Sequence, residues 1–214
     1  MAWGNRLILD YVSVGTVILT ILVAALTLTG FWTSSWLVVD SEMHPEMVPS
    51  FRMLFHKIGL WEICFRMYQN TGNPYQRYSV MCDSVIVNTN PNYRNPDFML
   101  ATQVLYSTGM GVVIIATVLM VVMLACGATR KIIFALGGCF LFSGFSICLA
   151  DIVFAACAFE KEGLFGWTQS NILGWTFWVA VASGCSLWLL GTCYFIVAYR
   201  LDRVHHAQFT KYIL

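Results

Sequence analysis

The stretch Ile58-Gly59-Leu60-Trp61-Glu62-Ile63-Cys64, together with Cys82 further along the chain, decides how this sequence is interpreted. Eight cysteines occur in the chain, and six of them lie in or beside strongly apolar runs. Only Cys64 and Cys82 lie in a long polar segment, so they share one compartment. If that compartment is extracellular, the two thiols can oxidise to a disulfide. The alternative is two unrelated free thiols.

The composition excludes a water-soluble domain. Of the 214 residues, 58% are hydrophobic and 11% are charged, whereas a soluble domain carries about 25% charged residues. We therefore predict an integral membrane protein that is embedded in a lipid bilayer. The formal net charge of +1 and the lack of a basic tract in the sequence argue against nucleic acid as a partner.

Four apolar runs are each long enough to cross about 30 Å of hydrocarbon as a helix. We predict membrane spans at residues 7–29, 98–126, 132–159 and 172–198. The rival interpretation of the first run is a cleaved signal peptide. Against it, the run is longer than the apolar part of a signal peptide and shows no clear cleavage site.

The distribution of lysine and arginine predicts the orientation of these spans. The short segments 1–6, 127–131 and 199–214 hold six basic residues against one acidic residue. Because cytoplasmic segments are enriched in basic residues, we expect both termini in the cytoplasm. Segments 31–97 and 160–171 are then extracellular, and the first of these places Cys64 and Cys82 under oxidising conditions.

Two β-strands are predicted around these cysteines. Apolar and polar residues alternate from Trp61 to Tyr68, and residues 78–87 are rich in β-branched and aromatic side chains. The residues 70–74 between them, Asn-Thr-Gly-Asn-Pro, are typical of a turn. The strands are expected to form a hairpin whose arms a Cys64–Cys82 disulfide can connect, with a stabilisation on the order of 3 kcal/mol.

The residues Trp36, Gly59-Leu60-Trp61-x-x-Cys64 and Cys82 resemble the pattern of the claudin branch of the claudin/PMP22/EMP tetraspan family. The four spans, the long first external segment and the short second one match the same family. The resemblance implies a left-handed four-helix bundle that carries a small extracellular antiparallel β-sheet. It also implies that the sheet is anchored to the bundle by Trp36, Gly59, Leu60 and Trp61.

The resemblance implies a function as well. Claudin-like proteins polymerise with same-family proteins in cis and pair with them in trans, which forms a paracellular barrier at lateral cell–cell junctions of the plasma membrane. Such a junction is either tight or septate. The alternatives are an auxiliary subunit of a membrane channel or receptor and a PMP22/EMP-type membrane-organising protein. The sequence has no catalytic constellation, metal-ligand spacing or cofactor motif, so we expect neither an enzyme nor a cofactor.

Two features depart from the pattern of vertebrate claudins. Seventeen residues separate Cys64 from Cys82, an insert that looks more like invertebrate claudin-type proteins and favours the septate junction. Gln103 stands where vertebrate claudins usually carry an arginine.

Charged and apolar residues of the external segments are candidates for ion selectivity and for adhesion. In the family, charges near the cysteine pair tune paracellular ion selectivity. The charges here are of mixed sign, which favours a barrier: Glu62, Arg66 and Arg77. Apolar residues in the second external segment are candidates for trans contact: Leu164, Phe165 and Trp167. For both sets the alternative is an ordinary solvated surface.

Three further features of the chain suggest modification, binding or packing. Cys126 at the cytoplasmic end of the second span is a candidate for palmitoylation. The last residues, Tyr212-Ile213-Leu214, fit capture by a PDZ scaffold. Glycines within the spans are expected to permit close helix packing: Gly109, Gly111, Gly137, Gly138, Gly144, Gly184 and Gly191.

Asp151 is the one carboxylate deep inside a late apolar run. An acid within a membrane span is a candidate functional residue. We favour the structural interpretation, in which neighbouring serine, threonine or glutamine side chains satisfy the carboxylate through hydrogen bonds across helices.

Overall fold

The structure is a computed structural model, and it describes residues 2–39, 54–68, 78–85, 97–126, 130–158 and 171–213. Within these ranges the elements follow the order α1, β1, β2, β3, β4, α2, α3, β5, α4. Two compact units are present. Unit 1 comprises Met1–Leu28, Leu105–Leu149 and Val181–Leu214, and unit 2 comprises Thr29–Val104 and Ala150–Ala180.

The helices are long and apolar, as the sequence predicts. Their bounds are Ala2–Trp32 for α1, Asp97–Cys126 for α2, Arg130–Ala158 for α3 and Trp175–Ile213 for α4. Each contains a stretch apolar enough to cross a membrane: Val14–Trp32, Asp97–Ala125, Lys131–Ala158 and Trp175–Arg200. The predicted architecture of four apolar helices with a small antiparallel sheet is confirmed.

The start of the fourth span differs from the prediction. Residues 172 and 173 were expected to be helical, but they belong to strand β5 (Asn171–Leu173), and α4 begins only at Trp175. The prediction was wrong here because a short apolar run looks the same whether it is strand or helix. Past Arg200, α4 continues to Ile213 over residues that were expected to form a polar tail.

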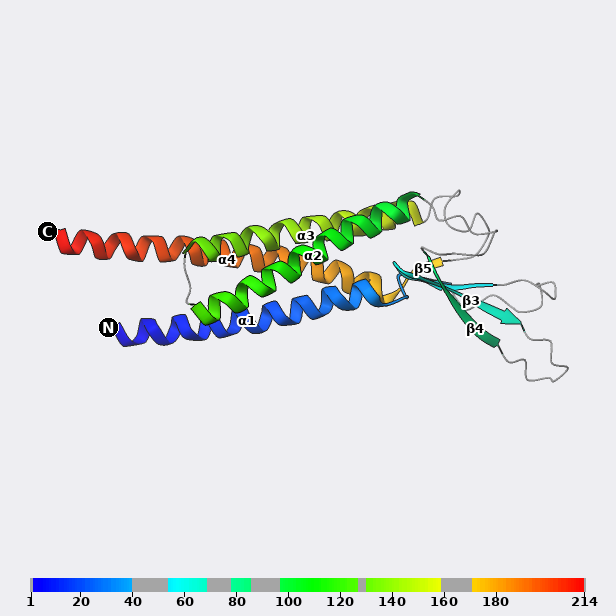
Figure 1. Cartoon of the computed structure of the whole chain (residues 1–214), viewed down its shortest axis with the longest axis horizontal. Helices are drawn as coiled ribbons and strands as arrows, with labels where there is room; N and C mark the ends of the chain where they lie inside the picture. The colour runs from blue at the N-terminus through cyan, green and yellow to red at the C-terminus, as the bar shows by residue number, and fades with distance from the viewer. Residues whose placement is uncertain are drawn as a thin grey trace. The chain divides into compact units, whose positions relative to one another are not determined.

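In unit 1, hydrogen bonds link α1 to α2, α2 to α3 and α1 to α4. Tyr106 of α2 donates to the carbonyl of Thr27 in α1 at 3.1 Å, and Ser143 of α3 donates to the carbonyl of Gly109 in α2 at 2.6 Å. The hydroxyls of Thr20 in α1 and Tyr194 in α4 lie 3.3 Å apart. Figure 1 marks both ends of the chain at the same end of these helices.

Glycines let α3 and α4 approach closely in unit 1. A Cβ atom at Gly137 would lie 3.3 Å from the carbonyl oxygen of Gly191, and one at Gly144 would lie 3.1 Å from that of Gly184. Gly109 is crowded by Ile147 of α3 in the same way. The packing prediction is therefore confirmed for these five glycines. It is wrong for Gly111 and Gly138, since a Cβ at either position would meet nothing within 4 Å.

The sheet lies in unit 2 and has the strand order β4-β3-β2-β1-β5, with every neighbouring pair antiparallel. The remaining bounds are Leu37–Val39 for β1, Leu54–Ile58 for β2, Glu62–Tyr68 for β3 and Tyr78–Ser84 for β4. A bulge between Phe55 and Lys57 shifts the register of β2 against β3. In Figure 1, β3 and β4 extend away from the helix ends of unit 2, while β5 lies next to the start of α4.

Two adjacent rows of residues cross all five strands. Because side chains alternate along a strand, the two rows point to opposite faces of the sheet. The inner row consists of Leu173, Leu37, Ile58, Ile63 and Asp83. The disulfide row consists of Ile172, Val38, Lys57, Cys64 and Cys82. The three central residues of the inner row are fully buried, which fixes the register of the sheet.

Candidate functional site

The predicted disulfide is confirmed. Cys64 and Cys82 lie directly opposite one another in the β3–β4 ladder and are bonded. Cys64 is fully buried, whereas Cys82 on the edge strand is exposed. The bond therefore connects the edge strand β4 to β3, which is packed into the sheet. This agrees with the predicted hairpin whose two arms the disulfide connects.

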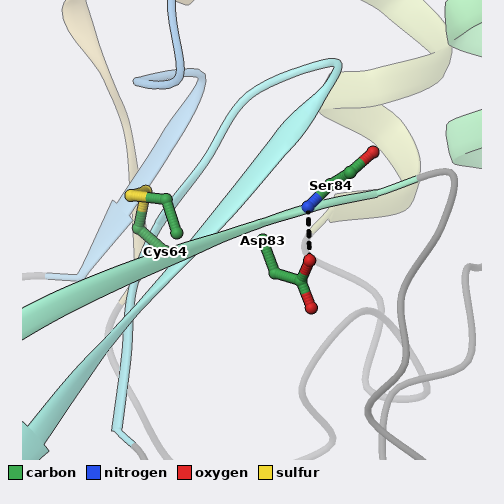
Figure 2. Close-up of a disulfide and its surroundings, with 4 residues drawn as sticks. Cys64, Asp83 and Ser84 are labelled. Carbon is green, nitrogen blue, oxygen red and sulfur yellow. Dashed lines mark hydrogen bonds between the residues drawn. A yellow bond between two sulfur atoms is a disulfide. The ribbon is translucent and has the colours of Figure 1, made fainter.

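The edge strand β4 is open along most of its described length. Val80 and Met81 are 50% and 56% exposed although they point to opposite faces of the strand. Figure 2 shows how β4 ends: the carboxylate of Asp83 accepts a hydrogen bond of 2.8 Å from the backbone N–H of Ser84. The next residue, Val85, donates its backbone N–H to the carbonyl of Trp61. One edge of the sheet is thus available for contacts over several residues.

The face that carries the disulfide also carries charges of both signs. Lys57 lies opposite Cys64 in the disulfide row, and Glu62 lies two residues before Cys64 on the same strand. Arg66 occupies the equivalent register position two residues after Cys64. Glu62 and Arg66 were predicted as charges near the cysteine pair. Lys57 was not among these candidates, because the bulge in β2 determines which residue lies opposite Cys64. Arg77 lies outside the described residues.

Trp36 lies at the junction of the sheet and the helices in unit 2. Its side chain is fully buried, and its ring centroid lies 5.1 Å from that of Phe154 in α3 and 5.9 Å from that of Phe177 in α4. The indole N–H donates to the carbonyl of Gly30 at 2.8 Å. The backbone N–H of Trp36 donates to the carbonyl of Ile58 in β2. Trp36 therefore contacts α1, α3, α4 and β2.

Two glycines allow backbones to touch around Trp36. A Cβ atom at Gly59 would lie 2.5 Å from the Cα atom of Ser34. One at Gly174 would overlap the carbonyl oxygen of Ser35, and the N–H of Gly174 donates to the carbonyl of Trp36 at 2.8 Å. Both positions therefore require glycine for steric reasons. Gly59 belongs to the spaced sequence pattern that predicts an anchor, whereas no role was predicted for Gly174.

Leu60 and Trp61 pack against α1 and α2. Leu60 is fully buried, and its carbonyl accepts a hydrogen bond of 2.6 Å from the side-chain amide of Gln103 in α2. Gln103 is itself buried, so this bond also satisfies a polar group that would otherwise be costly to bury. The ring of Trp61 lies 5.1 Å from that of Phe31. The Trp61 indole N–H is buried without a hydrogen-bond partner among the described residues.

The structural interpretation of Asp151 is wrong for the described part of the chain. The side chain is buried, at 4% exposure, but neither carboxylate oxygen has a hydrogen-bond partner there. Thr102 on the neighbouring helix α2 donates its hydroxyl to the carbonyl of Phe98 instead.

The remaining candidate residues lie at or beyond the limits of the described chain. Leu164, Phe165 and Trp167 lie outside it, as does Leu214. Cys126 is the last residue of α2, and Tyr212 and Ile213 end α4. Within the described residues, no group of three or more metal-ligating side chains occurs.

Four membrane-spanning helices and a disulfide-bonded antiparallel sheet that packs on a buried tryptophan define a four-span membrane protein. Comparison with known protein families assigns this four-span protein to one family. Residues 21–197 match the family described as PMP-22/EMP/MP20/Claudin tight junction, and the chain belongs to this family. No curated protein matches the chain.

Proposed function

We propose that this protein is a claudin-like cell–cell junction protein whose extracellular sheet associates with same-family proteins in cis and in trans, and so restricts paracellular flow. The observation that carries the proposal is the sheet itself. The three central residues of its inner row are buried and its edge strand is held by a disulfide, while Val80 and Met81 on that edge are exposed. A sheet that is rigid and open at one edge is suited to pairing with another protein.

The contacts around Trp36 support this function because they hold the sheet on the helices. The side chain of Trp36 and the backbones of Gly59 and Gly174 join the strands to three helices within unit 2. An adhesive surface on a well-packed base loses less conformational entropy on binding than a flexible loop. We propose the same anchoring role for Leu60 and Trp61.

A barrier is favoured over an ion-selective pore. The disulfide face combines Lys57, Glu62 and the register position of Arg66, so it presents no single sign of charge. A selective pathway requires one sign to dominate along the lining. We propose a septate junction because of the length of the insert between Cys64 and Cys82. We also propose that the carboxyl end binds a PDZ scaffold.

Contact enrichment between cells tests the proposal. The full chain, fused to a fluorescent protein, is expressed in non-adhesive cells that are mixed with cells lacking it. We expect enrichment at contacts between two expressing cells and not at contacts between an expressing and a non-expressing cell. Val80→Glu, which places a charge on the open edge, should reduce the enrichment at least threefold while surface delivery stays normal. The matched control Val80→Thr keeps the branched shape and should behave like the wild type.

The opposite outcome favours the alternative function. If the protein reaches the surface but shows no enrichment at any contact, autonomous adhesion is excluded. Co-purification of a channel or receptor from the same cells would then support an auxiliary subunit. If Val80→Glu and Val80→Thr behave alike, the edge strand is not the contact surface.

A further inference from the structure

Within unit 1, α3 and α4 meet along a line where large apolar side chains lie over glycines of the opposite helix (Figure 1). The ring of Phe195 in α4 lies 3.2 Å from the place that a Cβ atom at Gly137 would take. Leu141 of α3 lies 2.8 Å from the corresponding place at Gly191. Because glycine has no side chain, a larger residue of the opposite helix fills each gap. The two helices therefore form one continuous apolar surface.

This surface is only partly buried, and it lies within two of the membrane-spanning stretches, so it faces lipid. Phe134 of α3 is 59% exposed and Trp188 of α4 is 47% exposed, whereas Leu141 and Phe195 are half-buried. The rings of Phe134 and Phe195 are in contact, with centroids 4.7 Å apart, and Trp188 lies over Gly144. We call the line through Phe134, Phe195, Leu141 and Trp188 the α3–α4 seam.

The α3–α4 seam is as long as one leaflet of a bilayer is thick. Along α3 it extends from Phe134 to Gly144, which is about 15 Å at the rise of an α-helix. The hydrocarbon core of a bilayer is about 30 Å thick, so each leaflet contributes about 15 Å. An acyl chain that meets the seam at Phe134 can therefore remain in contact with it as far as Trp188.

Exposed polar residues lie at the Phe134 end of the seam. Lys131 is the first residue of the α3 span, and Tyr199 and Arg200 end the α4 span. The two helices run antiparallel, and Gly137 lies against the carbonyl of Gly191. Counted from this level, Tyr199 is displaced from Lys131 by about 3 Å along the axis and Arg200 by about 4–5 Å. The three side chains therefore lie at one depth.

These residues are connected to the seam by helical spacing. Lys131 lies three residues before Phe134, and Tyr199 lies four residues after Phe195, so each is a surface neighbour of the aromatic pair. Lysine and arginine at the ends of spans extend their charged groups to the head groups while their stems cover apolar surface. The short segments at this end of the spans hold six basic residues against one acidic residue. The end of the seam is thus positively charged.

We propose that the α3–α4 seam binds an anionic phospholipid, with an acyl chain along the seam and the head-group phosphate between Lys131 and Arg200. The ring of Tyr199, which has an apolar body and a polar tip, suits the boundary between chain and head group. Since this end of the spans is predicted to be cytoplasmic, the lipid comes from the leaflet that is rich in anionic lipids. The proposal is independent of adhesion, because no residue of the sheet takes part.

Native mass spectrometry of the purified full chain in detergent tests this site by counting bound lipids. Phosphatidylserine and phosphatidylcholine with identical acyl chains are titrated in parallel. One basic residue near an anionic head group is worth about a fivefold preference, so two predict about 25-fold tighter binding of the first phosphatidylserine. Glycerophosphoserine, which has the head group but no acyl chains, should not displace the lipid at equal concentration. Equal binding of both lipids, or displacement by glycerophosphoserine, would overturn the proposal.

Charge variants distinguish the seam from the general charge of the protein surface. Lys131→Gln and Arg200→Gln should each reduce the preference for phosphatidylserine about fivefold, and the double variant should bind both lipids alike. The control Arg6→Gln makes the same charge change in another short segment on the same predicted side, and it should keep the preference. If Arg6→Gln loses as much preference as Lys131→Gln, the lipid is attracted by overall charge and the seam is not its site.

A measurement on the wild type keeps the test valid if a variant does not fold. Phosphatidylserine and phosphatidylcholine that carry a photoreactive diazirine in one acyl chain are compared in nanodiscs, and labelled peptides are identified by mass spectrometry. The serine lipid should label the seam at least about fivefold more than the choline lipid. The exposed face of α1 around Ile18 and Leu22 should be labelled equally by both. The same ratio at α1 and at the seam would contradict a specific site.

Discussion

Replacing a glycine by alanine at a close backbone contact in unit 2 should lower the stability of the protein, because the added methyl group has no room. Gly59→Ala would place Cβ 2.5 Å from the Cα atom of Ser34, and Gly174→Ala would place it against the carbonyl of Ser35. Backbone atoms cannot move aside as a flexible side chain can. We therefore expect each variant to lose at least about 2 kcal/mol of stability, measured as a lower unfolding temperature and reduced surface delivery.

The matched control for these variants is Gly111→Ala. A Cβ at Gly111 meets nothing within 4 Å, so the change should be neutral or slightly stabilising, because alanine favours a helix over glycine by about 0.5–1 kcal/mol. If Gly59→Ala and Gly111→Ala unfold at the same temperature, the close approach at Gly59 does not contribute to stability.

Sequence alone identifies some residues of the Trp36 region and not others. Trp36, Gly59, Leu60 and Trp61 belong to a recognisable spaced pattern. The roles of Gly174 and Gln103 depend on backbone atoms of segments far away in the chain, namely Ser35 and Leu60. A single sequence contains no signal for such a contact. For Asp151 the sequence predicts hydrogen bonds from polar neighbours, but neither carboxylate oxygen has a partner among the described residues. Thr102 and Gln103 of α2 donate to backbone carbonyls instead.

Among the elements, the hairpin was predictable and the rest of the sheet was not. β3 has period-two alternation, β4 lies in a run rich in β-branched and aromatic residues, and the sequence between them is typical of a turn. β1 and β5 have three residues each, and they are strands because they pair with one another and because β1 also pairs with β2. Hydropathy assigned β5 to a helix, because pairing with a distant strand is not a local property.

The β3–β4 disulfide yields a prediction on accessibility. In Cys64→Ser the partner Cys82 is left as a free thiol on the exposed edge strand, so a membrane-impermeant maleimide added to intact cells should label it. The wild type should not be labelled without prior reduction. Cys185 and Cys193 lie exposed within α4, but lipid covers them and the reagent does not reach them. We also expect a loss of stability of about 3 kcal/mol on removal of the bond.

The double variant Cys64→Ser/Cys82→Ser is the control for this labelling, and it should give no signal. Equal labelling of the wild type without reduction would show that the disulfide does not form in cells. Absence of labelling in Cys64→Ser, with normal surface delivery, would contradict an exposed edge strand outside the cell.

At the scale of the whole molecule, the helices explain why the sheet can be small. A five-stranded sheet with two three-residue strands buries little apolar surface by its own strands. Trp36, Phe154 and Phe177 supply the missing core from the helix ends of unit 2. The helix ends of unit 2 thereby provide the hydrophobic base that an isolated sheet of this size lacks.

The basic residues of the short segments predict the orientation of the chain, and two engineered glycosylation sites can test this prediction. The natural sequence has no Asn-x-Ser/Thr sequon, so any N-glycan reports an introduced site. Gly72→Ser completes a sequon at Asn70 in the first external segment, and we expect it to be glycosylated. Gln208→Asn completes a sequon that ends at Thr210 in the carboxyl-terminal segment, and we expect no glycan there because that segment is predicted to face the cytoplasm. Gel mobility before and after glycosidase treatment measures both. A glycan on Gln208→Asn, or none on a surface-delivered Gly72→Ser, would reverse the topology and place the disulfide-bonded sheet on the cytoplasmic side, where it could not act in adhesion.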